Sequence, residues 1–176
     1  RLKHVDLVLC KSRHAVNVFS KESARTFHLG FTSEDQHAPD TVKDPARFVH
    51  IAGASTLKGT EAVLAAWQAH PEWPELTLVM NARLAPASVP ANVSLISTYL
   101  GDDEMKELQN ACGIHLCPSQ AEGWGHYIVE AMSTGAVVIT TDAPPMNELV
   151  TAGSGILVDV ASSTPRHLGT SYQVDQ

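Results

Sequence analysis

Short apolar runs alternate along the chain with segments whose apolar residues recur every three or four positions. From residue 47 onward this alternation predicts the order β-α-β-β-α-β-α-β-α-β. Strands separated by helices in this way pair in parallel, and helices then cover both faces of the sheet. The pattern therefore predicts the α/β class, with a doubly wound, Rossmann-like parallel sheet. Strands are expected at 47–53, 76–80, 93–96, 113–117, 136–141 and 155–160, and helices at 58–70, 102–111, 125–134 and 146–151.

The preceding part of the chain follows a shorter and less regular pattern. An apolar run at 5–10 predicts a strand, Ser12 is typical of a residue that caps a helix, and residues 27–30 predict a second short strand. Residues 31–46 are polar, contain two prolines and show no apolar period, so we expect a linker there. The chain starts and stops without a clear first or closing element, and we expect both ends to be cut.

The composition is that of a globular domain, and it limits the kinds of molecule that the chain is expected to bind. The net charge of −7 argues against a broad contact with nucleic acid, although a few local donors can still hold a small anion. Three cysteines lie in apolar stretches, which favours buried free thiols and a reduced, cytoplasmic setting. No apolar run approaches the roughly 20 residues of a membrane-spanning helix. Neither an Asp-x-Asp pair nor a His/Cys cluster is present, so we expect no metal, and we expect no cofactor.

Ligands of doubly wound sheets bind outside the carboxyl ends of the strands, so the loops that follow strands are the places to search. The first such loop runs from Gly53 to Thr60 and offers hydroxyl groups, among them that of Ser55. Lys58 stands at the start of a predicted helix, where a cation opposes the helix dipole. An anion over the helix N-terminus would explain this lysine. A solvated lysine beside a turn is the alternative.

The second loop carries the strongest signal in the chain. Gly123 and Gly125 flank Trp124 directly after a strand and open a helix, so backbone N–H groups can approach a ligand closely. Glu130 follows in the otherwise apolar run Tyr-Ile-Val-Glu-Ala-Met, where we expect burial on both sides. A buried carboxylate needs partners, either ligand hydroxyl groups or the arginine of a neighbouring element. His126 is expected on the surface unless a sugar lies beside it.

The segment from Glu122 to Glu130 resembles the paired-glutamate motif of the group 1 (family 4) retaining glycosyltransferases. Four further pieces match in the family's order: the strand-Gly-x-Ser-x-x-Lys-Gly loop, the helix from Glu104 to Ala111, the strand ending in Cys117-Pro118-Ser119, and Gly135-Ala136-Val137-Val138. Together they cover about residues 48–160. The resemblance implies the C-terminal, donor-binding half of the two-domain GT-B fold.

The resemblance also implies a role for each matching residue. Lys58 matches the lysine that contacts the donor diphosphate, and Glu130 matches the glutamate that binds the ribose hydroxyls. Glu122 matches the catalytic glutamate beside the donor sugar and the reacting centre. Ala54 stands where many relatives carry Arg or Lys, which leaves the second cation of the diphosphate site unassigned.

The remaining matches complete the expected binding site. Backbone amides of Gly123, Trp124 and Gly125 would face the sugar and phosphates, and the segment 98–100 would lie beside the base. The expected donor-binding residues are Ser55, Lys58, Gly59, Tyr99, Leu100, Gly123, Trp124, Gly125, His126 and Glu130.

The implied activity is transfer of a hexose-type sugar from a nucleoside-diphosphate sugar to an acceptor, with retention of anomeric configuration and without a metal. Residues 1–35 would be the C-terminal remnant of the acceptor-side domain, 36–46 a linker, and 47–176 the donor-binding domain, truncated at its C-terminus. We expect such a fragment to be inactive alone. The acceptor, whether glycan, lipid or small molecule, stays open, as does peripheral membrane association through the missing domain.

Two other readings compete with glycosyl transfer. One is a related enzyme, either a nucleotide-sugar epimerase or a sugar phosphorylase. A phosphorylase would need a pyridoxal-binding lysine region, which is not found in the sequence. The other is a non-catalytic nucleotide-binding module, which the alanine at position 54 favours.

Overall fold

A six-stranded parallel sheet forms the centre of the protein in the computed structural model, which describes residues 4–22, 25–166 and 169–175. Its strands lie in the order β5-β4-β3-β6-β7-β8, the classical Rossmann order. This confirms the predicted fold class. The strands are β3 (Asp44–Gly53), β4 (Leu76–Met80), β5 (Val93–Ile96), β6 (Cys112–Cys117), β7 (Val137–Thr141) and β8 (Ile156–Val158).

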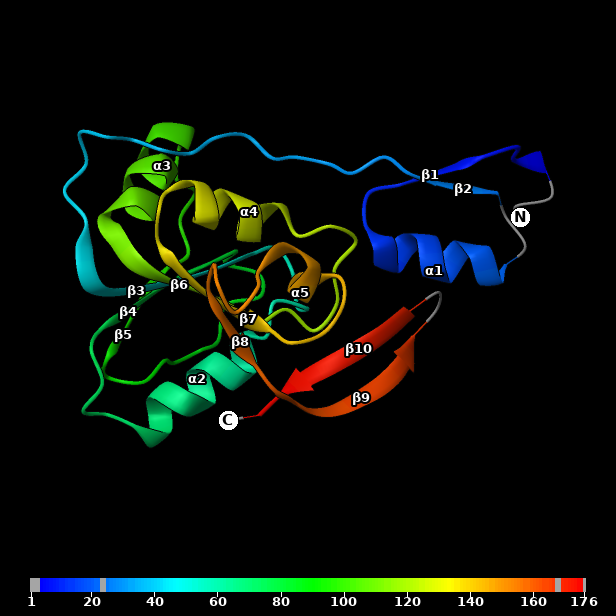
Figure 1. The fold of residues 1–176 in the computed structure, drawn as a ribbon. Coiled ribbons are helices and arrows are strands. Elements are labelled where there is room, and N and C mark those ends of the chain that lie inside the picture. The colour runs from blue at the N-terminus through cyan, green and yellow to red at the C-terminus, as the bar shows by residue number, and fades with distance from the viewer. Residues whose placement is uncertain (1–3, 23–24, 167–168, 176) are drawn as a thin grey trace.

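Helices cover both faces of this sheet (Figure 1). Helix α2 (Thr60–Ala69) lies on one face, and α3 (Asp102–Ala111) and α4 (His126–Ser133) lie on the other. The last helix, α5 (Met146–Leu149), is two residues shorter than predicted, because Val150 already has an extended backbone. No helix among the described residues is long and apolar enough to cross a membrane.

Two apolar clusters hold the helices to the sheet. Val63 and Trp67 of α2 pack with Leu76 and Leu78 of β4 on one face. The second cluster joins α4 and α5 to β6 and β7 and includes Ile128, Val138 and Met146. Every residue of β4 is buried, as expected for a parallel strand that is covered on both faces.

The strand order reverses between β3 and β6. Val49 of β3 pairs with Thr77 of β4 on one side and with His115 of β6 on the other. The chain therefore leaves β3 toward one edge of the sheet and leaves β6 toward the opposite edge. The crevice at such a switch point is the usual ligand site of doubly wound sheets.

The beginning of the chain forms a separate small unit of β1 (Val8–Cys10), α1 (Arg13–Lys21) and β2 (Thr26–His28), with β1 and β2 parallel. The hydroxyl of Ser12 caps α1 by accepting from the backbone N–H of Ala15. Strand β2 begins and ends before the predicted 27–30, because Gly30 has a positive φ of 72° that does not fit a strand. The following segment crosses α4 and α3 on its way to β3 (Figure 1).

An antiparallel hairpin of β9 (Val160–Arg166) and β10 (Gly169–Val174) follows the sheet and reaches toward α1 (Figure 1). The apolar pattern does not predict this hairpin and instead extends the preceding strand to residue 160. Six of the seven residues of β9 are exposed, so the strand lacks the apolar alternation by which strands are recognised. The hairpin is tied to the body of the domain by a hydrogen bond from Tyr172 N to Gln120 O of 2.8 Å.

Candidate functional site

A cavity of about 510 Å³ opens beside the carboxyl end of β6, where the loop that leads to α4 leaves the sheet. Seven of the predicted site residues line it together. Its lining residues are Lys11, Lys58, Glu122, Gly123, Trp124, Gly125, His126, Tyr127 and Glu130.

Two glycines set the backbone of this region. Gly59 has a φ of 75°, and a Cβ there would lie 2.1 Å from the carbonyl oxygen of Pro118, so the loops after β3 and β6 meet without room for a side chain. Gly125 has a φ of 103° and turns the chain into α4. Because glycine caps both α2 and α4, no capping side chain accepts from the first-turn N–H groups of either helix. Such free N–H groups suit an anion.

An ion pair and two hydroxyl groups form a short network in the cavity wall. Lys58 Nζ lies 2.5 Å from Glu122 Oε1, and the hydroxyl of Ser119 donates to the same oxygen over 2.7 Å. The hydroxyl of Tyr127 lies 2.5 Å from Ser119 Oγ. Lys58 Nζ also lies 3.6 Å from the centroid of the Tyr127 ring, a cation–π distance. The lysine is therefore fixed next to the predicted catalytic glutamate.

Burial keeps the hydroxyl and thiol groups near this network neutral. Burial raises the pKa of Tyr127 well above its usual value, and it also raises the pKa of Cys117 at the end of β6. Lys58 and Glu122 are thus the charged members of the network, and their side chains are 19% and 12% exposed.

Glu130 lies on α4 and lines the same cavity. It is half-buried rather than enclosed on both sides, because the cavity opens next to it. The described residues contain two ion pairs, Lys58–Glu122 and His70–Glu72, so the expected alternative of an arginine partner for Glu130 is not found among them.

Four predicted residues lie elsewhere. Ser55 Oγ accepts from the backbone N–H of Leu57 over 3.1 Å and so shapes the first loop. Gly59 is buried against Pro118. Tyr99 is 89% exposed and, like its half-buried neighbour Leu100, is not among the residues that line the cavity.

Two buried histidines of the sheet are structural. In His50 of β3, Nδ1 lies 2.8 Å from the carbonyl oxygen of Leu116, and Nε2 lies 2.9 Å from Thr60 Oγ1. These two hydrogen bonds join β3 to β6 and to the start of α2. His115 of β6 bonds to the carbonyl of Gln109. Burial lowers the pKa of each to about 4, so both are neutral at neutral pH.

Three residues of the site were missed from the sequence: Lys11, Ser119 and Tyr127. Ser119 and Tyr127 lie within the loop and helix that carried the motif, three residues before and five residues after Glu122. Lys11 comes from the N-terminal unit, and only its position directly after a predicted strand could have drawn attention to it.

A second cavity of about 370 Å³ lies on the other side of the 121–123 loop, between α1 and the β9–β10 hairpin. Glu122 and Gly123 line both cavities, so this loop separates them. The described residues include no group of three His, Cys, Asp or Glu side chains placed to hold a metal ion.

Comparison with solved structures shows the same fold in several glycosyltransferases. A Rickettsia africae glycosyltransferase has a TM-score of 0.72 at 12% identity, with 92% of this chain and 52% of that chain covered. HepE from Anabaena, in complex with UDP-glucose, has a TM-score of 0.68 at 20% identity, covering 89% and 50%. The pneumococcal O-GlcNAc transferase GtfA, in complex with UDP and GlcNAc, has a TM-score of 0.67 at 16% identity, covering 90% and 35%. The chain thus spans between a third and about half of the length of these proteins.

Sequence comparison finds a matching family for part of the chain. No curated protein sequence matches the chain. Residues 83–165, which include the whole segment from Glu122 to Glu130, match the family described as glycosyl transferases group 1. Residues 83–165 are therefore similar to the group 1 glycosyltransferases, and the chain has the Rossmann-like fold of one domain of the GT-B architecture.

Proposed function

We propose that the chain binds the nucleoside-diphosphate sugar donor of a retaining, hexose-transferring glycosyltransferase. The observation that carries this proposal is the single cavity that Lys58, Glu122, Glu130 and the loop before α4 line next to the switch point of the sheet. Two structural neighbours, GtfA and HepE, have structures in complex with UDP and GlcNAc and with UDP-glucose. A diphosphate would lie over the N-terminus of α4, and Lys58 would supply positive charge.

This arrangement suits the charge that develops during the reaction. The diphosphate gains negative charge as its bond to the sugar breaks. A fixed cation and free helix N–H groups stabilise that charge more strongly in the transition state than in the bound substrate. Such stabilisation needs no metal ion.

Glu122 and Glu130 are proposed to contact different parts of the donor. Glu130 sits on the second turn of α4, and its carboxylate would accept hydrogen bonds from the two ribose hydroxyls. Glu122 lies in the loop that separates the two cavities, so it would face the donor sugar on one side and the acceptor on the other. Ser119 would keep its carboxylate oriented through the 2.7 Å hydrogen bond.

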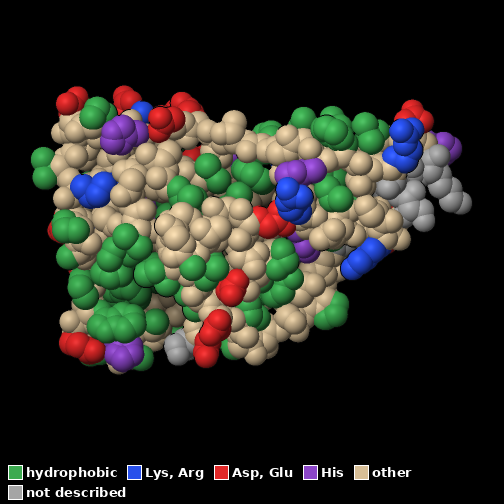
Figure 2. Space-filling model, viewed as in Figure 1, with side chains coloured by type: hydrophobic (Ala, Val, Ile, Leu, Met, Phe, Trp, Pro, Cys, Tyr) green, Lys and Arg blue, Asp and Glu red, His purple; other side chains and the backbone are tan. Residues whose placement is uncertain are grey.

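The N-terminal unit is proposed to belong to the acceptor-side domain. Its two strands form a sheet of their own, and none of the residues of α1 is buried. Hydrophobic side chains lie on the surface of this end of the molecule (Figure 2), among them those of Leu7, Leu9, Phe27 and Leu29. Parallel strands are normally buried on both faces, so these side chains would pack against the rest of that domain in a longer protein.

Calorimetric titration tests the proposed donor binding. UDP, GDP and ADP are titrated into the chain beside the matching nucleosides, with a chelator and with magnesium in parallel. We expect one nucleoside diphosphate to bind much more tightly than its nucleoside, and equally well in both buffers. If no nucleoside diphosphate produces heat, donor binding by this cavity is wrong. Loss of binding on chelation would contradict a metal-independent site.

A further inference from the structure

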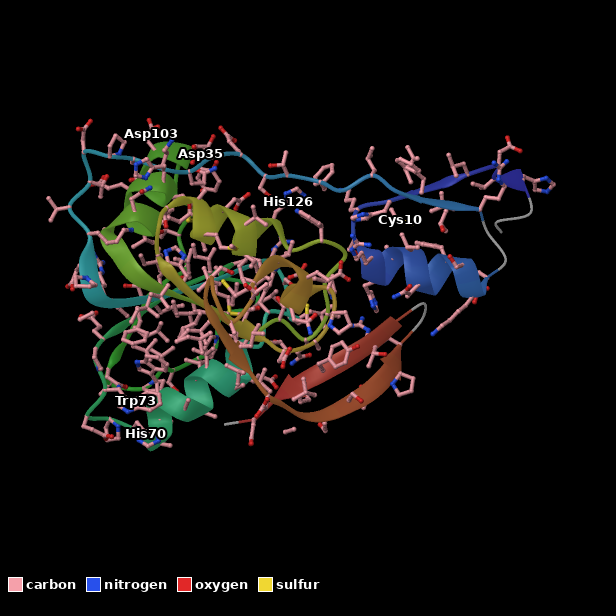
Figure 3. All side chains as sticks on the ribbon, in the orientation of Figure 1. Cys10, Asp35, His70, Trp73, Asp103 and His126 are labelled. Atoms are coloured by element: carbon pink, nitrogen blue, oxygen red, sulfur yellow. The ribbon has the colours of Figure 1, made fainter. Side chains whose placement is uncertain are left out.

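Lys11 lines the same cavity as Lys58 but comes from the N-terminal unit. It follows β1 directly and precedes Ser12, the capping residue of α1. It lines the cavity together with residues of the sheet domain, although it belongs to the N-terminal unit. Figure 3 labels the neighbouring Cys10, at the end of β1 in the N-terminal unit, and His126, at the start of α4 in the sheet domain.

Aromatic contacts fix the position of Lys11. Its Nζ lies 3.6 Å from the centroid of the Phe31 ring, the same distance that separates Lys58 Nζ from the Tyr127 ring. The Phe31 ring in turn packs edge-on against Trp124 and His126, with centroids 5.9 Å and 5.3 Å apart. The ammonium group is therefore held against the loop that opens α4.

Lys11 takes part in neither of the two ion pairs among the described residues. Lys58, the other cation that lines the cavity, is already paired with Glu122. Glu148 shares a smaller neighbouring cavity with Lys11, but its two oxygens accept from the backbone N–H groups of Arg13 and His14 over 2.7 and 2.6 Å. The positive charge of Lys11 is therefore available to interact with a bound ligand.

We propose that Lys11 supplies the second cation of the diphosphate site, in place of the basic side chain that position 54 lacks. The proposal rests on the donor-binding function proposed above. A nucleoside-diphosphate sugar carries two negative charges on its phosphates, and Lys58 alone offers one positive charge. With Lys11 included, the donor contacts both units of the chain, and its binding draws the N-terminal unit onto the start of α4.

Binding of UDP to the intact chain tests this role, with uridine as the reference ligand. Lys11→Met should weaken UDP binding about tenfold, the size of one charge-assisted contact, and leave uridine binding unchanged. It should also lower the dependence of UDP affinity on salt, because one charge pair is lost. Lys11→Arg should restore most of the affinity. Lys21→Met is the matched control, because it removes a lysine of the same unit at the far end of α1.

The outcomes separate this proposal from the function on which it rests. If Lys58→Ala weakens UDP binding and Lys11→Met does not, the role of Lys11 is wrong and donor binding stands. Equal losses for Lys11→Met and Lys21→Met would show a general effect of net charge and would also overturn the proposal. If the unchanged chain binds no nucleoside diphosphate, donor binding itself fails. Lys11 is exposed, so thermal melting should show that its variants are folded.

Discussion

Lys58 is the residue on which donor binding depends most directly. Its position at the start of α2 opposes the helix dipole, and its ion pair with Glu122 offsets that cost only in part. Lys58→Ala should weaken nucleoside-diphosphate binding about tenfold or more, since a charge-assisted contact contributes about 1.5–3 kcal/mol. Calorimetry with the matching nucleoside should show almost no change. Equal losses for both ligands would remove Lys58 from the phosphate site.

Glu130 offers a test of sugar recognition. Its carboxylate lines the cavity without an arginine partner among the described residues, so ribose hydroxyls are the expected donors. Glu130→Gln should reduce binding of the ribonucleotide more than binding of its 2′-deoxy analogue, by about threefold to tenfold for one weakened hydrogen bond. Competition binding with the two nucleotides measures this difference. A wild-type chain that does not distinguish the two sugars would contradict the ribose role.

His50 and His115 make the stability of the sheet depend on pH. Burial lowers the pKa of both from 6.5 to about 4, so between these values the unfolded chain binds protons that the folded chain does not. Stability should therefore fall as pH drops from about 6.5 toward 4, by up to about 1.4 kcal/mol per pH unit for each histidine. Above pH 6.5 both histidines are neutral in both states and contribute no slope.

Urea denaturation at pH 7.5, 6.0 and 5.0 measures this effect. His115→Asn should remove about half of the slope that the two histidines cause, whereas the exposed His37→Asn control should keep all of it. An unchanged slope in His115→Asn would show that carboxylates, and not the buried histidines, cause the acid sensitivity.

At the scale of elements, the apolar pattern predicted the doubly wound sheet because its parallel strands are buried and its helices show one apolar face. It failed for the β9–β10 hairpin, whose exposed strand carries no such signal. The segment from Glu122 to Glu130, which carries the paired-glutamate motif, also predicted most of the residues that line the cavity. These residues could be predicted together because they are near neighbours in sequence. Lys11 could not be found in this way, since it lies 47 positions before Lys58 and only the folded chain brings the two to one cavity.

Helices α1 and α5 are joined by a contact that the apolar pattern of the chain does not predict. Glu148 of α5 accepts hydrogen bonds from the first two N–H groups of α1, which have no partner within that helix. Glu148→Ala should destabilise α1 by about 1 kcal/mol, through loss of both the acceptor and the favourable charge. Hydrogen exchange should show faster exchange in α1, with the sheet unchanged. Glu107→Ala on α3 is the control, and equal exchange in both variants would contradict the role of Glu148.

At the scale of the whole molecule, the two cavities on either side of Glu122 and Gly123 suggest a donor site and an acceptor site that share one loop. Of these two cavities, residues of α1 line the second and Lys11 lines the first. The N-terminal unit therefore contacts both sites, although it provides one helix and two short strands. If this unit belongs to the acceptor-side domain, as proposed, the acceptor side is incomplete in this chain, and its exposed hydrophobic side chains would pack against the rest of that domain.

This incompleteness predicts that the chain binds donor nucleotide and transfers no sugar. Transfer requires an acceptor held against the donor, and correct positioning alone can contribute about 7–11 kcal/mol to lowering the barrier. With one side of the cleft open, water also remains in the site and weakens the electrostatic stabilisation of the departing diphosphate. The measurement compares this chain with a longer parent chain that contains a complete acceptor-side domain, using a panel of labelled donors. We expect both chains to bind the nucleotide and only the longer chain to transfer sugar. Turnover by this chain at a rate near that of the parent would show that the acceptor-side domain is dispensable, and the cleft between two domains would then not be the site of the reaction.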